Sequence, residues 1–289
     1  MLKSTLSLYR LAWYWRIPGK WLIFLLVLLF VCYPNPVLLY RNIGRWRNPN
    51  SLVNPNSPAL EPLLRDVEQQ LGGDRSPGAA FLAVESTVRK QIRYAFDWET
   101  WGVTDYFPTV EEIMDKGQED CDGRAIIAAS VLRRLGFEAF VVADFAHAWV
   151  QTPQGDLMGP RKAEAVVTGV NGPRFTWVAM REMPDALAFG VAVFPVIREW
   201  IILLTAWLLL LGSVGGRAAM LSLGLMVAGL YMLRFASWDF RQPLYWVQTC
   251  AWVSLAGGLS VLLTPRRWPW RTRRLADTRV HAPTHADAL

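Results

Sequence analysis

The sequence of this 289-residue chain is poor in cysteine and histidine, with three of each. Cys32 and Cys250 lie inside apolar segments, so Cys121 has no disulfide partner in the polar middle of the chain. This excludes a disulfide framework. The chain also lacks internal repeats and any nucleic-acid-binding motif, and we expect neither a nucleic-acid partner nor a cofactor.

Acidic residues are missing from the first 20 positions, whereas basic residues are present in both tails. The basic residues are Lys3, Arg10, Arg16 and Lys20 at the start and Arg266, Arg267, Arg271, Arg273, Arg274 and Arg279 at the end. Positive charge beside apolar segments marks the cytoplasmic side of a membrane. Residues 1–20 and 265–289 are therefore predicted to be cytoplasmic tails.

What the chain has in abundance is apolar residues, at 53%, with 15 Trp and a mean hydropathy of +0.20. This composition predicts membrane insertion. Residues 21–40 form a first span, because no small-residue cleavage site follows them as in a signal peptide. Three further spans are predicted in residues 199–264, after an interfacial segment at 186–198. Four spans place residues 41–185 outside, and the bilayer and other membrane proteins are the expected partners of the spans.

The polar middle begins with an Asn- and Pro-rich stretch, residues 41–58, which we interpret as a linker. Residues 59–185 then form a soluble domain. The spacing of apolar residues and the capping signals predict helices and, after them, strands, which indicates an α+β fold. The predicted helices are 59–71, 79–92, 109–117 and 121–135, and the predicted strands are 139–143, 147–152, 163–168 and 175–180.

Cys121 begins the last of these helices, and His147 begins the second strand. A thiolate is stabilised at a helix N-terminus, and an imidazole can take the thiol proton and later protonate a leaving amine. The backbone N–H of Cys121 is a candidate oxyanion donor. Taken singly, Cys121 is a buried small residue and His147 a core imidazole. Together they indicate thiol-based acyl transfer.

Asp120 and Asp122 flank the thiol, and carboxylates near a thiol raise its pKa. Our first interpretation is that both residues cap the helix, with Asp120 as the N-cap. The alternative is that they bind a hard cation such as Ca²⁺.

The residues around Cys121 and His147 resemble the transglutaminase-like superfamily, in particular the bacterial transglutaminase-like cysteine proteinases. The resemblance covers about residues 85–160. The matching stretches are WGVTDYFPTVEE (101–112), EDCDGRA (119–125), LRRLG (132–136) and HAW (147–149). It implies a papain-like fold with helices before an antiparallel sheet, Cys121 as nucleophile, His147 as base, a protein or peptide substrate, and a periplasmic domain on a bacterial inner membrane.

The family places an acid on the strand after the histidine, and here the sequence departs from the pattern. Gly159 occupies the expected position. Asp156 is the nearest acid and our candidate for the third catalytic residue, although Gly-Asp is also ordinary turn chemistry. Asp144 is the other nearby acid. Losing the orienting acid weakens a triad without abolishing a thiol–imidazole pair.

Other side chains near the motif are candidates for the cleft or the oxyanion site, namely Trp101, Tyr106, Gln118 and Trp149. Trp101 and Tyr106 precede the nucleophile, and core packing is the competing interpretation for both. Trp149 lies two residues after His147 on a strand and so shares its face.

Three functions follow. The leading one is a membrane-anchored enzyme that forms a thioester at Cys121 from a peptide or amide carbonyl, as a protease, amidase or transamidase. The alternative is a catalytically degenerate domain that binds proteins of the cell envelope. The third is a transporter or channel, for which intramembrane charge would be the signal. The charged residues Arg198, Glu199, Arg217 and Arg234 all fall at predicted span ends.

Overall fold

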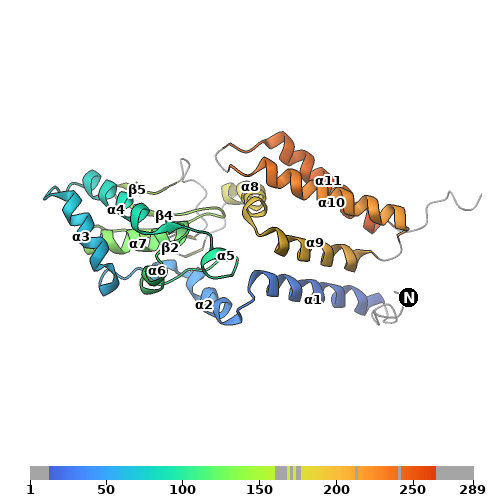
Figure 1. Cartoon of the computed structure of the whole chain (residues 1–289), viewed down its shortest axis with the longest axis horizontal. Helices are drawn as coiled ribbons and strands as arrows, with labels where there is room; N and C mark the ends of the chain where they lie inside the picture. The colour runs from blue at the N-terminus through green and yellow to red at the C-terminus, as the bar shows by residue number, and fades with distance from the viewer. Residues whose placement is uncertain are drawn as a thin grey trace, which may run out of the picture.

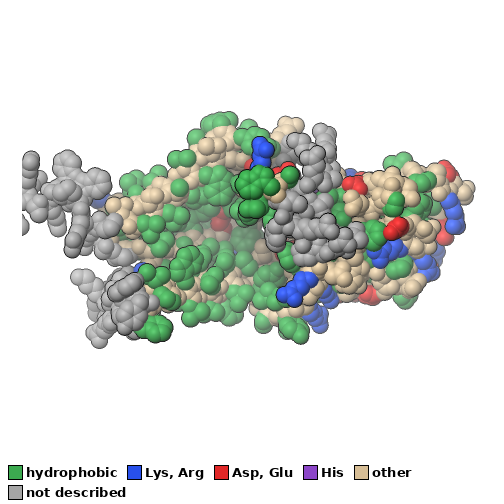
Figure 2. Space-filling view, turned by 180° about the vertical axis from the view of Figure 1, so that it is seen from behind, with side chains coloured by type: hydrophobic (Ala, Val, Ile, Leu, Met, Phe, Trp, Pro, Cys, Tyr) green, Lys and Arg blue, Asp and Glu red, His purple; other side chains and the backbone are tan. Residues whose placement is uncertain are grey.

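A computed structural model describes residues 13–159, 168–169, 172–173, 177–211, 214–239 and 242–264. This part of the chain is mostly helical, with two small sheets. A head that contains both sheets lies at one end, and long apolar helices lie at the other (Figure 1). Figure 2 shows hydrophobic side chains covering the helical end, with most of the charged side chains on the head.

The first predicted span is broken into two helices. Helix α1 runs from Trp13 to Cys32, and α2 runs from Pro36 to Arg47 at 88° to it. Pro34 disfavours a helical residue before it, and the Asn35 side chain caps α2 by accepting from the Val37 N–H at 3.0 Å. The apolar helix thus begins and ends earlier than the predicted boundaries of 21 and 40.

Residues 41–58, which we interpreted as a linker, pack against the head. They include the end of α2 and the 3₁₀ turns η2 (Pro49–Leu52) and η3 (Pro58–Leu60). The Asn50 amide bonds both the N–H and the carbonyl of Val141, at 2.8 and 2.9 Å, as a neighbouring strand would. Leu52 and Val53 are buried. The Asn-Pro pattern does specify turns, but tertiary contacts make these turns part of the domain.

The four predicted helices of the head are confirmed as α3 (Glu61–Leu71), α4 (Pro77–Gln91), α6 (Val110–Lys116) and α7 (Cys121–Arg134). Local signals explain their ends, such as the Thr109–Glu112 capping box of α6. A short helix, α5 (Asp97–Thr100), lies before α6. Helix α7 lies in the centre of the core, and Ile126, Ile127 and Leu132 on it are fully buried.

The larger sheet is antiparallel and packs on α7. Its order is β5 (Gly155–Leu157), β4 (Ala148–Thr152), β3 (Phe140–Ala143), β6 (Thr168–Gly169) and β7 (Gly172–Pro173). The predicted strands 139–143 and 147–152 are confirmed as β3 and β4. Residues 163–167 of the third prediction lie outside the described residues. The fourth was wrong, because residues 177–180 begin an apolar helix, where a short apolar run is ambiguous between the two structures.

A second, two-stranded sheet joins β1 (Arg93–Tyr94) to β2 (Gln118–Glu119) in parallel, with Tyr94 opposite Glu119. This pairing brings the start of α5 next to the start of α7, although the two are far apart in the sequence. The candidate site lies at this junction.

The apolar half contains α8 (Trp177–Val193), α9 (Val196–Leu210), α10 (Gly216–Ala236) and α11 (Tyr245–Leu263). Helices α10 and α11 are each long and apolar enough to cross a membrane. The pairs α1–α2 and α8–α9 qualify only as bent units, with an angle of 116° between α8 and α9. The described residues thus hold two to four candidate spans. The predicted interfacial segment is the second half of α8 and its corner with α9.

A partly buried ion pair between Arg234 and Glu199 stabilises that corner. Arg234 of α10 donates to the carbonyls of Ala192 and Phe194 and to a Glu199 carboxylate oxygen, each at 2.8 Å. The pair therefore satisfies backbone carbonyls that the break between α8 and α9 leaves free. We interpret these charges as a structural clasp, which weakens the case for a transport pathway based on them.

Candidate active site

Cys121 is the first residue of α7, and Asp120 is its N-cap, as predicted. The Asp120 side chain accepts a hydrogen bond from the Asp122 N–H at 3.2 Å. Cys121 is partly exposed as a residue, whereas its thiol group is buried. The backbone N–H of Ala148, at the start of β4, stabilises the thiolate form of Cys121, as does the N–H of Cys121 itself. The structure therefore brings the sulfur beside the residue that directly follows His147.

The His147 ring is half-buried, and its Nε2 atom lies 2.8 Å from the carbonyl oxygen of Met158. A carbonyl can only accept, so Nε2 carries the proton and donates. In the neutral imidazole Nδ1 is then the nitrogen without a proton, which is the tautomer required of a base that acts through Nδ1. The rings of His147 and Trp149 are nearly parallel, with their centroids 6.3 Å apart, so Trp149 packs along the imidazole.

The Met158 main-chain carbonyl contacts the His147 ring, where an orienting acid was expected. Asp156 instead accepts from the Trp149 indole N–H at 3.3 Å, and Asp144 accepts from the backbone N–H groups of Ala146 and His147 at 2.7 Å. Met158 has a φ of 57°, the only positive φ at a non-glycine residue within the described part of the chain. Met158 has this left-handed conformation, and its carbonyl oxygen lies at the imidazole of His147.

Gly159 is confined by its neighbours. A Cβ atom there would lie 3.2 Å from the Asp156 Cβ and 3.3 Å from the Trp149 Cδ1, tighter than most real contacts. A larger side chain at position 159 would therefore displace Trp149 or the hairpin. Gly159 and the Met158 carbonyl at His147 belong to one local arrangement.

Because Asp156 supports Trp149 and not the imidazole, we expect Asp156→Asn to lower any Cys121-dependent turnover by less than about ten-fold. Replacing a true triad acid by its amide costs roughly 10⁴-fold. The measurement is turnover against pH for wild type and variant, with Asp144→Asn as the comparison. A loss near 10³-fold in Asp156→Asn with an intact fold would instead assign Asp156 to the imidazole.

Four carboxylates gather beside the thiol: Asp97, Glu119, Asp120 and Asp122. One oxygen of each lies within 4.8 Å of the others. Glu119 is fully buried, and Asp97 and Asp122 are only 2% and 5% exposed. Asp97 and Glu119 were missed by the sequence analysis. Glu119 could have been included from the sequence, because it directly precedes Asp120. Asp97 could not, because only the pairing of β1 with β2 brings it to the cluster.

Burial and mutual repulsion raise the pKa values of these acids. The pKa of Glu119 rises to about 7 because of its burial and the charge of Asp120. The pKa values of Asp97 and Asp122 lie well above their usual range for the same two reasons. Without a counter-charge, the cluster therefore retains protons near neutral pH.

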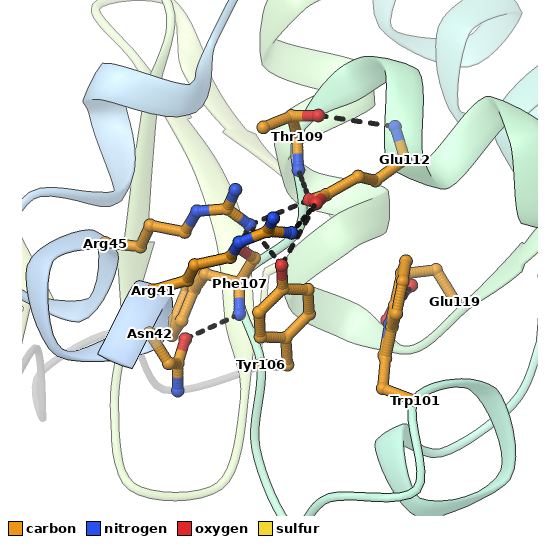
Figure 3. A network of polar contacts seen from close by, with 9 residues as sticks. All are labelled: Arg41, Asn42, Arg45, Trp101, Tyr106, Phe107, Thr109, Glu112 and Glu119. Atoms are coloured by element: carbon orange, nitrogen blue, oxygen red, sulfur yellow. Dashed lines mark hydrogen bonds and ion pairs between the residues drawn. The ribbon is translucent and has the colours of Figure 1, made fainter. Parts of the chain in front are cut away.

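Several predicted cleft residues in fact hold this cluster. Trp101 donates its indole N–H to Glu119 at 2.9 Å, and the Tyr106 backbone N–H donates to Asp97 at 2.7 Å. Figure 3 shows Trp101 beside Glu119, and the Tyr106 hydroxyl directed away from it, toward Arg45 and Glu112. Tyr106 is fully buried and therefore does not line a cleft. Trp101 has its indole N–H bonded to Glu119 and not open to an oxyanion.

The two remaining cleft candidates are also engaged. The Gln118 amide bonds Arg93 and the Thr100 hydroxyl, the latter at 3.3 Å. Trp149 is fully buried under His147, so it supports the imidazole from inside the head. The prediction that Trp149 shares the face of His147 is confirmed.

The cluster has the chemistry of a divalent-cation site. Asp97 Oδ1 and Glu119 Oε1 are buried and accept from no N–H or O–H group within the described part of the chain, and the two carboxyls interact through a hydrogen bond that needs a proton on one of them. A divalent cation would replace that proton and bind both oxygens. Carboxylate oxygens are the donors that Ca²⁺ and Mg²⁺ prefer. The residues therefore fit a hard cation, and the set is larger than the two residues Asp120 and Asp122 proposed from the sequence.

The acids also act on the thiol. Burial, together with the charges of Asp120 and Asp97, raises the pKa of Cys121 well above its usual range, and the N–H groups of Ala148 and Cys121 oppose this only in part. The resting sulfur is therefore a protonated thiol. It needs a base, or a counter-charge in the cluster, before it can act as a nucleophile.

No protein-family model, no curated protein and no solved structure matches this chain. The function must therefore be argued from the geometry of the site.

Proposed function

We propose that the chain is a membrane-anchored, transglutaminase-like thiol enzyme, with a papain-like head, that forms a thioester at Cys121 from a peptide or amide carbonyl. The observation that supports this most directly is the meeting of the α7 N-terminus with the start of β4. There the sulfur lies beside the backbone N–H of Ala148, the residue that directly follows His147, and the His147 Nε2 atom donates to the Met158 carbonyl. In the neutral imidazole this leaves Nδ1 as the nitrogen that can accept a proton.

The proposed reaction uses one proton carrier. His147 Nδ1 takes the thiol proton as the sulfur attacks the carbonyl carbon, and the N–H of Cys121 donates to the oxygen that becomes negative. The imidazolium then protonates the leaving amine, the C–N bond breaks, and a thioester remains. Water activated by His147 releases an acid and restores the thiol, whereas an amine acceptor gives a new amide.

The acids and the Met158 carbonyl have supporting roles in this proposal. The carbonyl holds the imidazole in the tautomer that leaves Nδ1 free, although a neutral acceptor stabilises the imidazolium less than a carboxylate does. Asp97, Glu119, Asp120 and Asp122 would hold a divalent cation, which supplies positive charge that favours the thiolate.

We further propose the topology that the sequence predicts, with the head on the periplasmic side of a bacterial inner membrane and both tails in the cytoplasm. The tails lie outside the described residues except for the start of α1. The bent pairs α1–α2 and α8–α9 each meet the head at their break, which is compatible with two of the four spans ending beneath it (Figure 1).

The raised pKa of Cys121 favours the alternative, a degenerate domain that binds envelope proteins. The rate of alkylation by iodoacetamide separates the two, in a chain with Cys32 and Cys250 replaced by alanine. With calcium present at pH 7, the enzyme proposal expects Cys121 to react faster than N-acetylcysteine amide, and His147→Ala to remove the excess. A rate below that of the reference compound with and without calcium supports the binding module.

A further inference from the structure

A row of four aromatic rings crosses the head from the candidate site toward the apolar helices. Tyr94 and Phe96 meet edge to face with ring centroids 5.5 Å apart. Phe96 and Trp98 stack at 4.4 Å, and Trp98 meets Phe194 edge to face at 6.3 Å. We call Tyr94, Phe96, Trp98 and Phe194 the aromatic row. Tyr94 is 47% exposed and the other three are partly exposed, so their rings are not sealed in the core.

One end of the row lies at the thiol. Burial and, after it, the nearby charges of Cys121 and Asp120 at the start of α7 raise the pKa of the Tyr94 phenol. The guanidinium of Arg124, one turn after Cys121, lies 5.0 Å from the centre of the Tyr94 ring. The same guanidinium donates to the Ile92 carbonyl, so Tyr94 is held in this position by α7 itself.

The other end of the row lies at the corner between two apolar helices. Phe194 is placed between α8 and α9, and its carbonyl accepts from Arg234. Helix α5, which carries Trp98, is the part of the head that faces α8 and α9 (Figure 1). The row therefore connects the reactive sulfur with the level at which α8 and α9 meet the head.

The head is fixed at that level by backbone contacts. Arg198 of α9 donates to the Gly102 carbonyl at 2.8 Å, and the Thr104 N–H donates to the Cys32 carbonyl at the end of α1 at 3.0 Å. Cys121 is thus held at a set distance from the apolar helices and does not move freely on a flexible linker. A substrate amide bond that reaches Cys121 must therefore lie at the same distance from the apolar helices as Cys121 does.

From this placement we infer the substrate class: a polypeptide tethered in the same membrane, whose extended segment next to its anchor lies along the aromatic row and presents its carbonyl to Cys121. This inference rests on the proposed function. Partly exposed rings bind apolar side chains and peptide planes without demanding one sequence. Tethering raises the effective concentration of such a segment, which a substrate free in solution does not gain.

The experiment compares two thiol probes on the full-length protein in phosphatidylethanolamine–phosphatidylglycerol vesicles, with Cys32 and Cys250 replaced by alanine. One probe is a short Leu- and Ser-containing peptide with an iodoacetamide at one end and a palmitoyl anchor at the other. The second is the same peptide without the anchor. The quantity measured is the ratio of the labelling rates of Cys121 by the anchored and the free probe, at equal total probe concentration.

We expect the anchored probe to react faster, and Phe96→Ala and Trp98→Ala each to lower the ratio about ten-fold, because the tethered segment loses its contact surface. Trp98→Phe, which keeps a ring, should recover most of the ratio. Leu82→Ala is the matched control, since Leu82 is a 72% exposed apolar residue on α4, outside the row. Equal rates for both probes, or ratios unchanged in both row variants, would overturn the inference.

Labelling requires only an accessible thiol, so this experiment separates the inference from the proposed function. If the ratio falls in the row variants but the wild type shows no catalytic turnover, the docking of a tethered segment is supported and the enzyme proposal is contradicted. Turnover of soluble peptides with an unchanged ratio would retain the enzyme and remove the tethered substrate. If Trp98→Ala unfolds the head, the Trp98→Phe and Phe96→Leu ratios decide the matter.

Discussion

Cys121→Ala is expected to abolish acyl transfer, with turnover falling by roughly 10³-fold or more, and His147→Ala should cost about as much. The sulfur is the atom that would carry the acyl group, and the imidazole is the base that frees it from a proton held tightly by burial and nearby acids. Because both residues act in one step, the double variant should lose little more than either single one.

The measurement is the hydrolysis of fluorescein-labelled casein, run beside the incorporation of a fluorescent primary amine into casein. The two readouts separate hydrolysis from transamidation. Cys250→Ala is the matched control, because Cys250 is an exposed residue of α11 that is far from the head in the sequence. Activity unchanged in both Cys121→Ala and His147→Ala would remove the enzyme proposal and leave the binding module.

The second large effect concerns Glu119. Its pKa rises to about 7 in the folded chain because of burial and the charge of Asp120. Between the ordinary glutamate pKa and this value, the folded chain holds a proton that the unfolded chain has released. The free energy of unfolding of the cation-free protein should therefore fall as pH rises from about 4.5 through 7. A pKa shift of the size given for Glu119 corresponds to a fall on the order of 3 kcal/mol, which the interacting carboxyls Asp97, Glu119 and Asp122 share.

Glu119→Gln should weaken this pH dependence, to which Asp97 and Asp122 also contribute, and should raise the thermal midpoint of the cation-free protein at pH 7.5. Tryptophan fluorescence in detergent with EDTA, at pH 5 and pH 7.5, gives both quantities. Glu68→Gln is the control, since Glu68 is exposed on α3. A midpoint that is independent of pH in the wild type would contradict the assignment.

Calcium should reverse the loss of stability, because a cation replaces the protons and pairs with the two unpartnered oxygens of Asp97 and Glu119. At about 100 times its dissociation constant, a ligand of the folded state adds roughly 2.7 kcal/mol. Glu119→Gln should lose this calcium effect, whereas Glu68→Gln should retain it. Equal midpoints with EDTA and with calcium in the wild type would exclude the cation site.

The sequence predicted the elements whose causes are local. Asp120 caps a helix that begins at Cys121 because its side chain reaches an N–H two residues away. The strand that begins after His147 follows from a short run of apolar, aromatic and β-branched residues, and the capping box of α6 follows from two residues three positions apart. Helices α10 and α11 follow from uninterrupted apolar runs. In each case the residues that decide the structure lie within a few positions of one another.

Contacts between residues far apart in the sequence could not be predicted in this way. The break at Pro34 was visible, but the packing of residues 41–58 against β3 was not, because an Asn-rich turn and an Asn that pairs with a strand look the same in a sequence. The start of the predicted strand 175–180 lies outside the described residues, and its remainder is helical. An apolar run of that length does not itself choose between strand and helix.

The sequence alone determined that a thiol begins a helix, that an imidazole begins a strand, and that both lie between apolar segments. Only the tertiary structure decided which groups surround them. The parallel pairing of β1 with β2 brings Asp97 to Glu119, and the left-handed backbone at Met158 accompanies the contact of its carbonyl with the His147 ring. Backbone conformation and strand pairing set these positions, and neither depends on the side chain found at a single position.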